Sequence, residues 1–353
     1  MLLPEAPKLT NETPSAREKR LSDVKSTGAP KNVFEGKRDF VDGLGENGKQ
    51  GFWSWLLAIT TLTFVACWFH ILVGLLLFCW VPWVRVAIVL LISTVLLPAC
   101  EWDAFKHGAI LRSWRQYFNY SIIVKYALRH NVDKSYLFCW FPHGVLAFGW
   151  MSAAGTDTHY FRDRKVYGIA GSSVFYIPLF RHLSACLGGL PATRVNINRL
   201  LEMGRAVVFL SVGGMAEMFL TSNRKTEQIY LKDRKGFLRL AVAGGHTIIP
   251  MYVFGQSQML TLWSPKFLGS LSRKLGFTMG FLYGRWGLPI PRPIDCMVVT
   301  GLPIDCGPAM SKDEPGFDEK VEQLHAQFTI AIKDIFETHK KEYGWGHKQL
   351  RIL

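Results

Sequence analysis

Residues 136–144 read Tyr136-Leu137-Phe138-Cys139-Trp140-Phe141-Pro142-His143-Gly144. An uninterrupted apolar run that ends in a Pro-His-Gly turn is typical of a buried strand followed by a loop. Apolar runs of strand length occur at 135–141, 166–170, 206–212, 247–254 and 296–301. Helical patterns accompany them at 175–187, 198–204, 236–243 and 318–339. Strands that alternate with helices predict an α/β domain with a central, mainly parallel sheet, in which reactive groups collect beyond the carboxyl ends of the strands.

His143 is the first candidate for such a reactive group. The flanking Pro142 and Gly144 place it on a turn directly after an apolar strand. The ordinary pKa of histidine, near 6.5, suits general-base catalysis at neutral pH. A histidine that merely satisfies a turn is the alternative reading of this motif.

A second motif follows the run 206–212, where the sequence continues Gly213-Gly214-Met215-Ala216-Glu217. The glycine pair allows a sharp turn. The carboxylate beyond it could orient the histidine or recognise a substrate hydroxyl. Alternatively, Glu217 sits in the first turn of a helix, where the helix dipole favours an acidic side chain.

A third motif is Lys232-Asp233-Arg234-Lys235-Gly236-Phe237, at the start of a helical pattern. Cations at the N-terminal end of a helix are unfavourable for stability. Together with free backbone N–H groups, however, they make a site for phosphate. A solvated basic turn is the alternative.

Residues 51–84 contain no Lys, Arg, Asp or Glu, and Arg85 is the only charge up to residue 100. A span needs about 20 apolar residues, so 53–78 is long enough for one helix and 84–98 is short for a second. Pro82 and its aromatic neighbours predict a helical hairpin that turns near residues 80–85 at a lipid–water interface. It either spans the bilayer twice or re-enters one leaflet, and a buried core helix is the third reading. The flanking lysines and arginines predict that both ends are cytosolic.

These features divide the chain into a disordered N-terminal segment at 1–50, a membrane hairpin at 51–100 and an α/β domain at 101–353. Residues 1–50 lack apolar periodicity. Residues 105–129 have amphipathic spacing among cations, which predicts a helix on the membrane surface or an ordinary domain helix with a basic face. The seven cysteines include no Cys-x-x-Cys pair, which indicates reduced thiols facing the cytosol.

The chain carries a net charge of +14, and residues 101–353 carry +12 of it. A basic domain suggests an anionic partner such as nucleic acid, an acidic lipid surface or a phosphorylated substrate. The predicted membrane segment argues against nucleic acid.

In this order, the motifs resemble those of the type-two diacylglycerol acyltransferases and their monoacylglycerol and wax-ester-forming relatives. The resemblance runs from about Trp53 to Leu353 and implies a glycerolipid-acyltransferase-like domain after the hairpin. Besides the hairpin, it rests on five blocks: the 136–144 block, Ser172-Ser173-x-Phe175 with Pro178 and Arg181, Val212-Gly213-Gly214-x-x-Glu217, Arg234-Lys235-Gly236-Phe237, and Gly284-Arg285-Trp286-Gly287-Leu288-Pro289-Ile290-Pro291.

The resemblance implies acyl transfer from acyl-CoA, a co-substrate, to an acylglycerol hydroxyl, with no metal and no other cofactor. His143 would be the catalytic base and Glu217 its supporting carboxylate, although the related glycerolipid acyltransferases place an acidic residue where this chain has Phe148. Many members read His-Pro-His-Gly, so Phe141 replaces the first histidine and could modify the choice of acceptor. Arg234 and Lys235 would bind the phosphates of coenzyme A, with Arg181 as a second anchor. The implied substrate-binding residues are Phe141, Pro142, Gly144, Arg181, Gly213, Gly214, Arg234, Lys235 and Gly236.

The apolar segment begins at residue 51, too late for a cleaved signal peptide, which predicts a retained anchor in the endoplasmic reticulum membrane, with lipid droplets as a second location. Diacylglycerol is the expected acceptor, monoacylglycerol and fatty alcohol are alternatives, and a homo-oligomer is left open. A non-enzymatic hairpin protein would explain the membrane segment but has no need of His143 or Glu217. A hydrolase would need a nucleophile elbow, and no Gly-x-Ser-x-Gly motif is present.

Overall fold

A central sheet organises the protein, for which a computed structural model describes residues 36–45, 48–125, 135–156, 160–161, 164–220, 225–275 and 279–353. The strands run in the order β1-β2-β11-β8-β3-β6-β4-β5, and β12 pairs with the free end of β8. Their bounds are β1 (Arg38–Phe40), β2 (Ser121–Ile123), β11 (Met297–Thr300), β8 (Thr247–Phe254), β3 (Tyr136–Phe141), β6 (Ala206–Ser211), β4 (Lys165–Ala170), β5 (Gly189–Pro191) and β12 (Ile304–Asp305).

The five strands from β8 to β5 are all parallel to one another. β11 is antiparallel to β8, and β2 is parallel to β11. The prediction of an α/β domain with a mainly parallel sheet is therefore confirmed. All five predicted strands are present, and their ends differ from the prediction by a residue at most.

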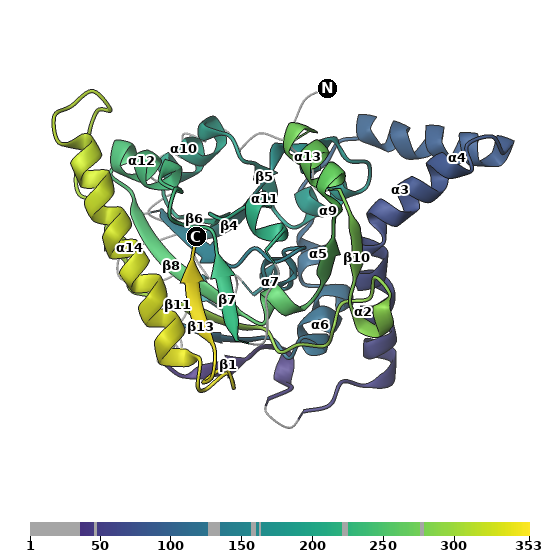
Figure 1. Ribbon diagram of the computed structural model, residues 1–353, viewed down its shortest axis with the longest axis horizontal. Helices are drawn as coiled ribbons and strands as arrows, with labels where there is room; N and C mark the ends of the chain where they lie inside the picture. The colour runs from purple at the N-terminus through teal and green to yellow at the C-terminus, as the bar shows by residue number, and fades with distance from the viewer. Residues whose placement is uncertain are drawn as a thin grey trace, which may run out of the picture.

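Two hydrophobic cores lie on opposite faces of this sheet. Alternate residues of β3 supply them, with Leu137, Cys139 and Phe141 on one face and Phe138 and Trp140 on the other. The first face is covered by α10 (Arg194–Glu202), α12 (Gly236–Gly244) and α14 (Phe317–His339). The second is covered by α2 (Phe52–Ala66), α6 (Ala109–Tyr117) and α7 (Phe148–Ala153). Figure 1 shows α14 and α2 on opposite sides of the molecule.

Two small sheets flank the central one. β7 (Thr226–Ile229) pairs in parallel with β13 (Gln349–Ile352), near the end of the chain. β9 (Thr261–Trp263) pairs with β10 (Phe281–Tyr283) in antiparallel fashion, and α13 (Lys266–Leu275) lies between them in the sequence.

The expected long helix over 53–78 is broken. α2 ends at Ala66, and α3 (Trp68–Leu77) continues at an angle of 57° to it. Within the described part of the chain, no helix alone is both long and apolar enough to cross a bilayer, although α2 and α3 together would be. α2 packs on α6, where the Trp114 indole donates to the Thr61 hydroxyl at 2.7 Å, so its path follows the domain.

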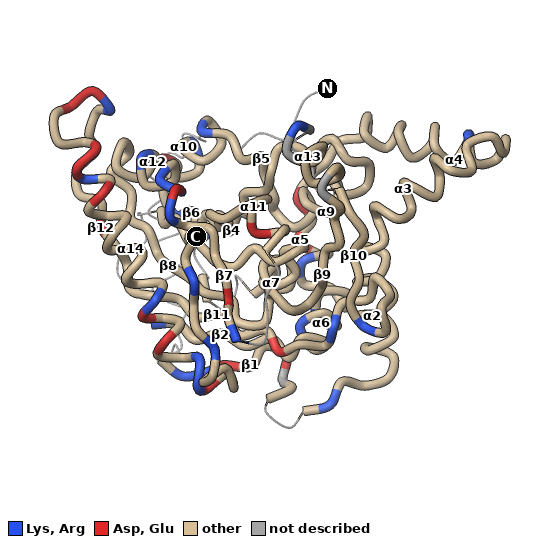
Figure 2. The backbone as a smooth tube through the Cα atoms, in the orientation of Figure 1, with Lys and Arg blue, Asp and Glu red and all other residues tan. Residues whose placement is uncertain are grey.

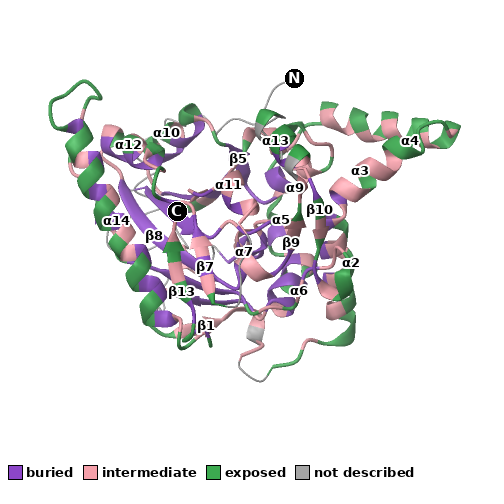
Figure 3. Cartoon of the chain, in the orientation of Figure 1, coloured by how far each residue is buried: buried purple, intermediate pink, exposed green. Residues whose placement is uncertain are grey.

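Beyond this bend the chain leaves the domain. α3 and α4 (Pro82–Ser93) project from the body and carry almost no charge (Figures 1 and 2). None of the residues of α4 is buried, and most of its large apolar side chains are exposed (Figure 3). Such a bare apolar surface is unusual in water and is typical of contact with lipid or another protein.

Residues 105–129 do not form the single helix that their spacing predicts. α5 (Asp103–Lys106) and α6 are short, and the chain then turns at Asn119, whose φ is +40°. Ile122 and Ile123 belong to β2, where β-branched side chains are favoured, and residues 126–129 lie outside the description. The segment 1–50, expected to be disordered, supplies β1, while its residues 1–35 also lie outside the described ranges.

Candidate active site

Three turns come together where β3, β6 and β8 end. The strands are parallel neighbours, and Trp140 of β3 pairs with Ser211 of β6 and with Met251 of β8. The turns after them therefore share one edge of the sheet. They carry His143, the Gly213-Gly214 pair and Gln256, respectively.

His143 is held with one defined ring nitrogen available for chemistry. Its Nδ1 lies 2.9 Å from the carbonyl oxygen of Gly144. Because a carbonyl can only accept, Nδ1 carries the proton, and Nε2 is the nitrogen that can act as a base. The ring stacks on Trp140, with centroids 5.9 Å apart and planes 16° apart. Burial lowers the pKa of His143, which keeps the imidazole neutral near pH 7.

Glu217 holds the backbone of His143 and not its imidazole. It lies in α11 (Met215–Met218), is buried, and its Oε2 accepts the His143 backbone N–H at 2.6 Å. Its Oε1 accepts the backbone N–H of Tyr230 at 2.7 Å. A β-carbon on Gly213 would stand 2.0 Å from the Glu217 carboxyl carbon, so only glycine fits there. Glu217 thus joins the turn after β3 to the loop after β7.

The ionisation of Glu217 gives a testable dependence of stability on pH. Burial raises the pKa of this carboxyl from 4.5 to about 7, although two backbone N–H groups and Arg234 oppose the shift. The folded state therefore retains the proton to higher pH than the unfolded chain does, and it loses stability as the pH rises from about 4.5 to 7. We expect the Tm difference between the parent and Glu217→Gln to shrink across this window. Thermal unfolding in detergent at several pH values measures it.

The matched control for this experiment is Glu319→Gln, because Glu319 is an exposed carboxylate on α14. Its Tm difference from the parent should not vary over the same range. A constant difference for Glu217→Gln as well would contradict the raised pKa of Glu217.

Gln256 fixes the whole turn that carries His143. Its Nε2 donates to the carbonyl oxygens of His143 at 3.0 Å and Leu146 at 2.5 Å, and its Oε1 accepts the Gly149 N–H at 2.7 Å. Only 1% of this side chain is exposed. A β-carbon on Gly144, whose φ is +64°, would come within 2.7 Å of the Gln256 backbone oxygen. The histidine turn is thus built around Gln256.

We expect Gln256→Leu to lower kcat more than it changes the KM for the substrates. The change removes the Gln256 partner of the His143 carbonyl and of the Gly149 N–H, each worth about 1–3 kcal/mol, so the turn loses its fixed position. Steady-state kinetics and thermal unfolding measure the two effects. Gln256→Glu should regain activity as the pH falls, because a protonated carboxyl donates again; Gln258→Leu, on the neighbouring half-buried glutamine, is the control. Equal kinetics for all variants would refute the positioning role.

A cavity of about 340 Å³ opens beside His143. Its walls are mainly apolar, and they include His143, Trp140, Trp150, Phe180, Phe209, Met215, Val65, Trp68, Leu262 and Leu282. The hydroxyl of Ser211 is one of few polar groups in this lining, and it has no hydrogen-bond partner among the described residues. The chamber suits a long apolar substrate with one polar group near the histidine.

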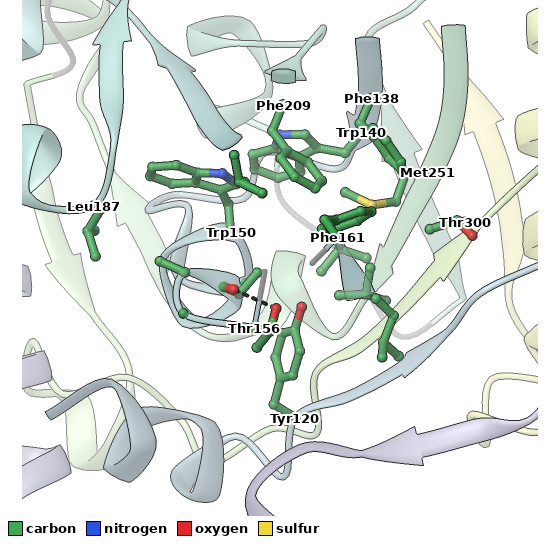
Figure 4. A pocket seen from close by; sticks show the side chains of 18 of the residues that line it. Tyr120, Phe138, Trp140, Trp150, Thr156, Phe161, Leu187, Phe209, Met251 and Thr300 are labelled. Atoms are coloured by element: carbon green, nitrogen blue, oxygen red, sulfur yellow. Dashed lines mark hydrogen bonds between the residues drawn. The ribbon is translucent and has the colours of Figure 1, made fainter. Parts of the chain in front are cut away.

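Three aromatic residues close one side of this chamber. Trp140, Trp150 and Phe209 also line a second cavity of about 30 Å³, which Figure 4 shows. Trp150 packs closely on Gly168 of β4, since a β-carbon on Gly168 would stand 1.8 Å from its ring. The aromatic wall therefore limits the depth of the large cavity.

Of the two expected phosphate-binding cations, Arg234 lies nearer the histidine turn. Its guanidinium is 3.5 Å from the Gly213 carbonyl oxygen and 5.0 Å from the Tyr230 ring centroid. Lys235, by contrast, forms an ion pair with Glu322 of α14 at 2.6 Å. Gly236 begins α12 and is exposed. Arg234 thus adds positive charge beside Gly213 and Glu217.

The remaining candidates lie farther from the cavity. Phe141 is fully buried on the opposite face of the sheet, where its ring is 6.3 Å from that of Phe328. Pro142 joins it through a cis peptide bond and is buried. Arg181 is buried in α9 (Phe180–Cys186), whose Phe180 and Ser184 line the cavity whereas Arg181 does not.

Sequence reasoning missed Gln256 and the contribution of Ser211. Gln256 follows the run 247–254 just as His143 follows 135–141, so the same strand-end rule would have found it. Ser211 is the last residue of β6. The sequence alone does not show that Ser211 lines the cavity, because this depends on its pairing with Trp140 of the neighbouring strand.

The chain is similar to known proteins over most of its length. Residues 64–352 match the family model described as diacylglycerol acyltransferase. The chain is 29% identical over 279 residues to diacylglycerol O-acyltransferase 2 of Danio rerio, a match that covers 72% of each chain. It is 28% identical over 265 residues to human 2-acylglycerol O-acyltransferase 3, covering 69% of this chain and 74% of the relative. It is 27% identical over 326 residues to human acyl-CoA wax alcohol acyltransferase 2, covering 84% and 92% respectively.

Proposed function

Because this chain belongs to the diacylglycerol acyltransferase family, we propose that it moves a fatty acyl group from acyl-CoA to the free hydroxyl of diacylglycerol, making triacylglycerol. The observation that carries this proposal is a histidine base on the wall of an apolar cavity of about 340 Å³. The acyl chain and the acylglycerol are both largely apolar. The reaction takes place at a single hydroxyl oxygen of the acylglycerol. The cavity offers them lipid-like walls and a base at one place.

The chemistry follows from the state of His143. Nε2 takes the proton of the acceptor hydroxyl as that oxygen attacks the thioester carbonyl. The tetrahedral intermediate then collapses, the carbon–sulfur bond breaks, and the thiolate of coenzyme A takes the proton back from the imidazolium. The histidine ends the cycle neutral, and no covalent acyl-enzyme is needed.

The neighbouring residues support this reaction in different ways. Glu217 and Gln256 hold the backbone of His143 from its N–H and its C=O sides. The Ser211 hydroxyl can donate to a substrate oxygen within the cavity. Arg234 supplies a positive charge for the phosphates of coenzyme A as a charge-assisted donor.

The proposal extends to the membrane. Diacylglycerol is dissolved in the bilayer, and the projecting α3 and α4 expose apolar side chains with Arg85 as their single charge. We propose that this pair anchors the enzyme in the endoplasmic reticulum membrane with both ends in the cytosol, and that it also suits lipid droplets. A soluble donor and an insoluble acceptor could then meet at one site.

The acceptor can be tested directly by competition. The relatives carry names for diacylglycerol, 2-acylglycerol and wax alcohol acyltransferases. Purified protein in detergent would receive labelled acyl-CoA with equal amounts of diacylglycerol, monoacylglycerol and a long-chain alcohol. Labelled triacylglycerol as the main product supports the proposal. Labelled diacylglycerol or wax ester assigns the other acceptor, and label in free fatty acid only would indicate a hydrolase.

A further inference from the structure

The large cavity has walls from two elements far apart in the sequence. Val65, Trp68 and Phe69 come from the bend between α2 and α3. Leu262 and Leu282 come from β9 and β10. The cavity therefore extends from His143 to the place where the β9–β10 pair meets the base of the projecting helices.

The segment from β9 to Leu288, including α13, also exposes large apolar side chains. Trp263 is 58% exposed, Phe267 71% and Trp286 68%. On α13, the exposed residues Phe267, Leu271 and Lys274 are spaced by four and three positions, which puts them on one helix face. This face is apolar with a cation at its end.

The exposed surface of this segment is continuous with that of α3. The Phe281 ring on β10 lies 6.1 Å from the Phe69 ring, 5.8 Å from the His70 ring and 5.7 Å from the Trp263 ring. Figure 1 shows α13 and β10 at the end of the molecule from which α3 and α4 project. Both apolar elements thus belong to one surface.

The charge of the segment indicates which kind of partner its surface contacts. Residues 261–288 contain four Lys and Arg and no Asp or Glu. The Arg285 guanidinium lies 4.2 Å from the centroid of the exposed Trp286 ring. Exposed tryptophans interleaved with cations are typical of segments that lie in the headgroup region of a lipid leaflet. A folded protein partner would have to leave these cations unpaired or supply its own carboxylates.

We propose that residues 261–275 and 279–288 form a second membrane-contacting surface, which rests on a phospholipid leaflet and, with α3, frames the lipid entrance to the cavity. The proposed lipid contact is inferred from the exposed side chains and does not depend on the catalytic function. The entrance role rests on the proposed acyltransferase function. The two parts are therefore tested separately.

The first test detects lipid contact without any catalysis. Benzoylphenylalanine replaces Phe267 or Trp286 in the full chain, which is bound to phosphatidylcholine vesicles with and without phosphatidylserine and then illuminated. Phospholipid adducts at both positions are expected, with more when phosphatidylserine is present. Position 330 on α14 is the control, because Ile330 is as exposed as Trp286, at 68%, but lies on the other side of the sheet. Adducts between two protein chains at 267 and 286, or no lipid adduct there with vesicle-bound protein, would overturn the proposal.

The second test concerns the entrance. Phe267→Asp with Trp286→Asp should lower turnover of diacylglycerol presented in vesicles by about tenfold or more, the equivalent of about 1.4 kcal/mol, because carboxylates are repelled from the leaflet. Turnover of a short-chain diacylglycerol in detergent should not change, and Ile330→Asp should affect neither. Equal losses in both assays would refute the entrance role. Absence of transfer by the parent itself would count against the proposed function and leave the cross-linking result standing.

Discussion

Replacing His143 with alanine is expected to lower kcat by about 10²–10⁴-fold, the usual contribution of a general base, while the protein stays folded. The protein is expected to stay folded because of the hydrogen bonds made by the backbone of this residue. Glu217 and Gln256 bind the backbone N–H and C=O of His143, which alanine retains. The variant therefore removes the base and leaves its turn in place. Triacylglycerol synthesis by purified protein, and in a host unable to make this lipid, measures the effect.

The control for this variant is His347→Ala, since His347 is exposed and outside the cavity. It should match the parent in both assays. Thermal unfolding should show similar Tm values for the parent and His143→Ala. If His143→Ala restored triacylglycerol as well as the parent at equal protein level, His143 would lose its role while the acyltransferase assignment would stand.

Replacing Lys348 with methionine is expected to lower the free energy of unfolding by about 3–5 kcal/mol, the cost of breaking a buried ion pair from one side. Lys348 and Glu227 are 2% and 0% exposed and lie 2.5 Å apart. Ser257 also donates to the Glu227 carboxylate at 2.6 Å. Without Lys348 this buried carboxylate loses its lysine partner. Thermal or denaturant unfolding in detergent measures the loss.

Two further variants separate the ion pair from general damage. The double variant Glu227→Gln with Lys348→Met removes both charges and should recover most of the lost stability. Lys341→Met, at an exposed lysine of the same segment, should have almost no effect. A double variant as unstable as Lys348→Met would show that packing of the lysine stem, and not an unpaired charge, carries the effect.

Apolar patterning predicted the sheet well because parallel strands are buried on both faces. Residues 247–254 form β8 as expected, and all of β8 is buried. The order of the strands brings His143, Gly213 and Gln256 to one edge, which follows from the general rule for parallel sheets. The rule located the histidine and glycine turns, and it was not applied to Gln256.

Local pattern could not predict what depends on distant contacts. The expected helix over 53–78 breaks at Cys67, where no proline or glycine marks it, because α2 follows its packing on α6. β2 is only three residues long and falls in a stretch with helical spacing. Glu217 was read as a partner of the imidazole, whereas its carboxylate binds two backbone N–H groups. Such a contact depends on backbone direction, which sequence spacing does not reveal.

The pairing of β13 with β7 has a consequence for the order in which the protein matures. Glu227 and Lys348 are 121 positions apart, and β7 runs directly into Tyr230, whose N–H binds Glu217. Contacts of such long range form late in folding, because the intervening chain must first be ordered. As a ribosome makes the chain from its N-terminus, α3 and α4 emerge long before residues 349–352. If α3 and α4 form the proposed membrane anchor, they would reach the membrane before β13 docks, and the contact between Tyr230 and Glu217 would form only afterwards.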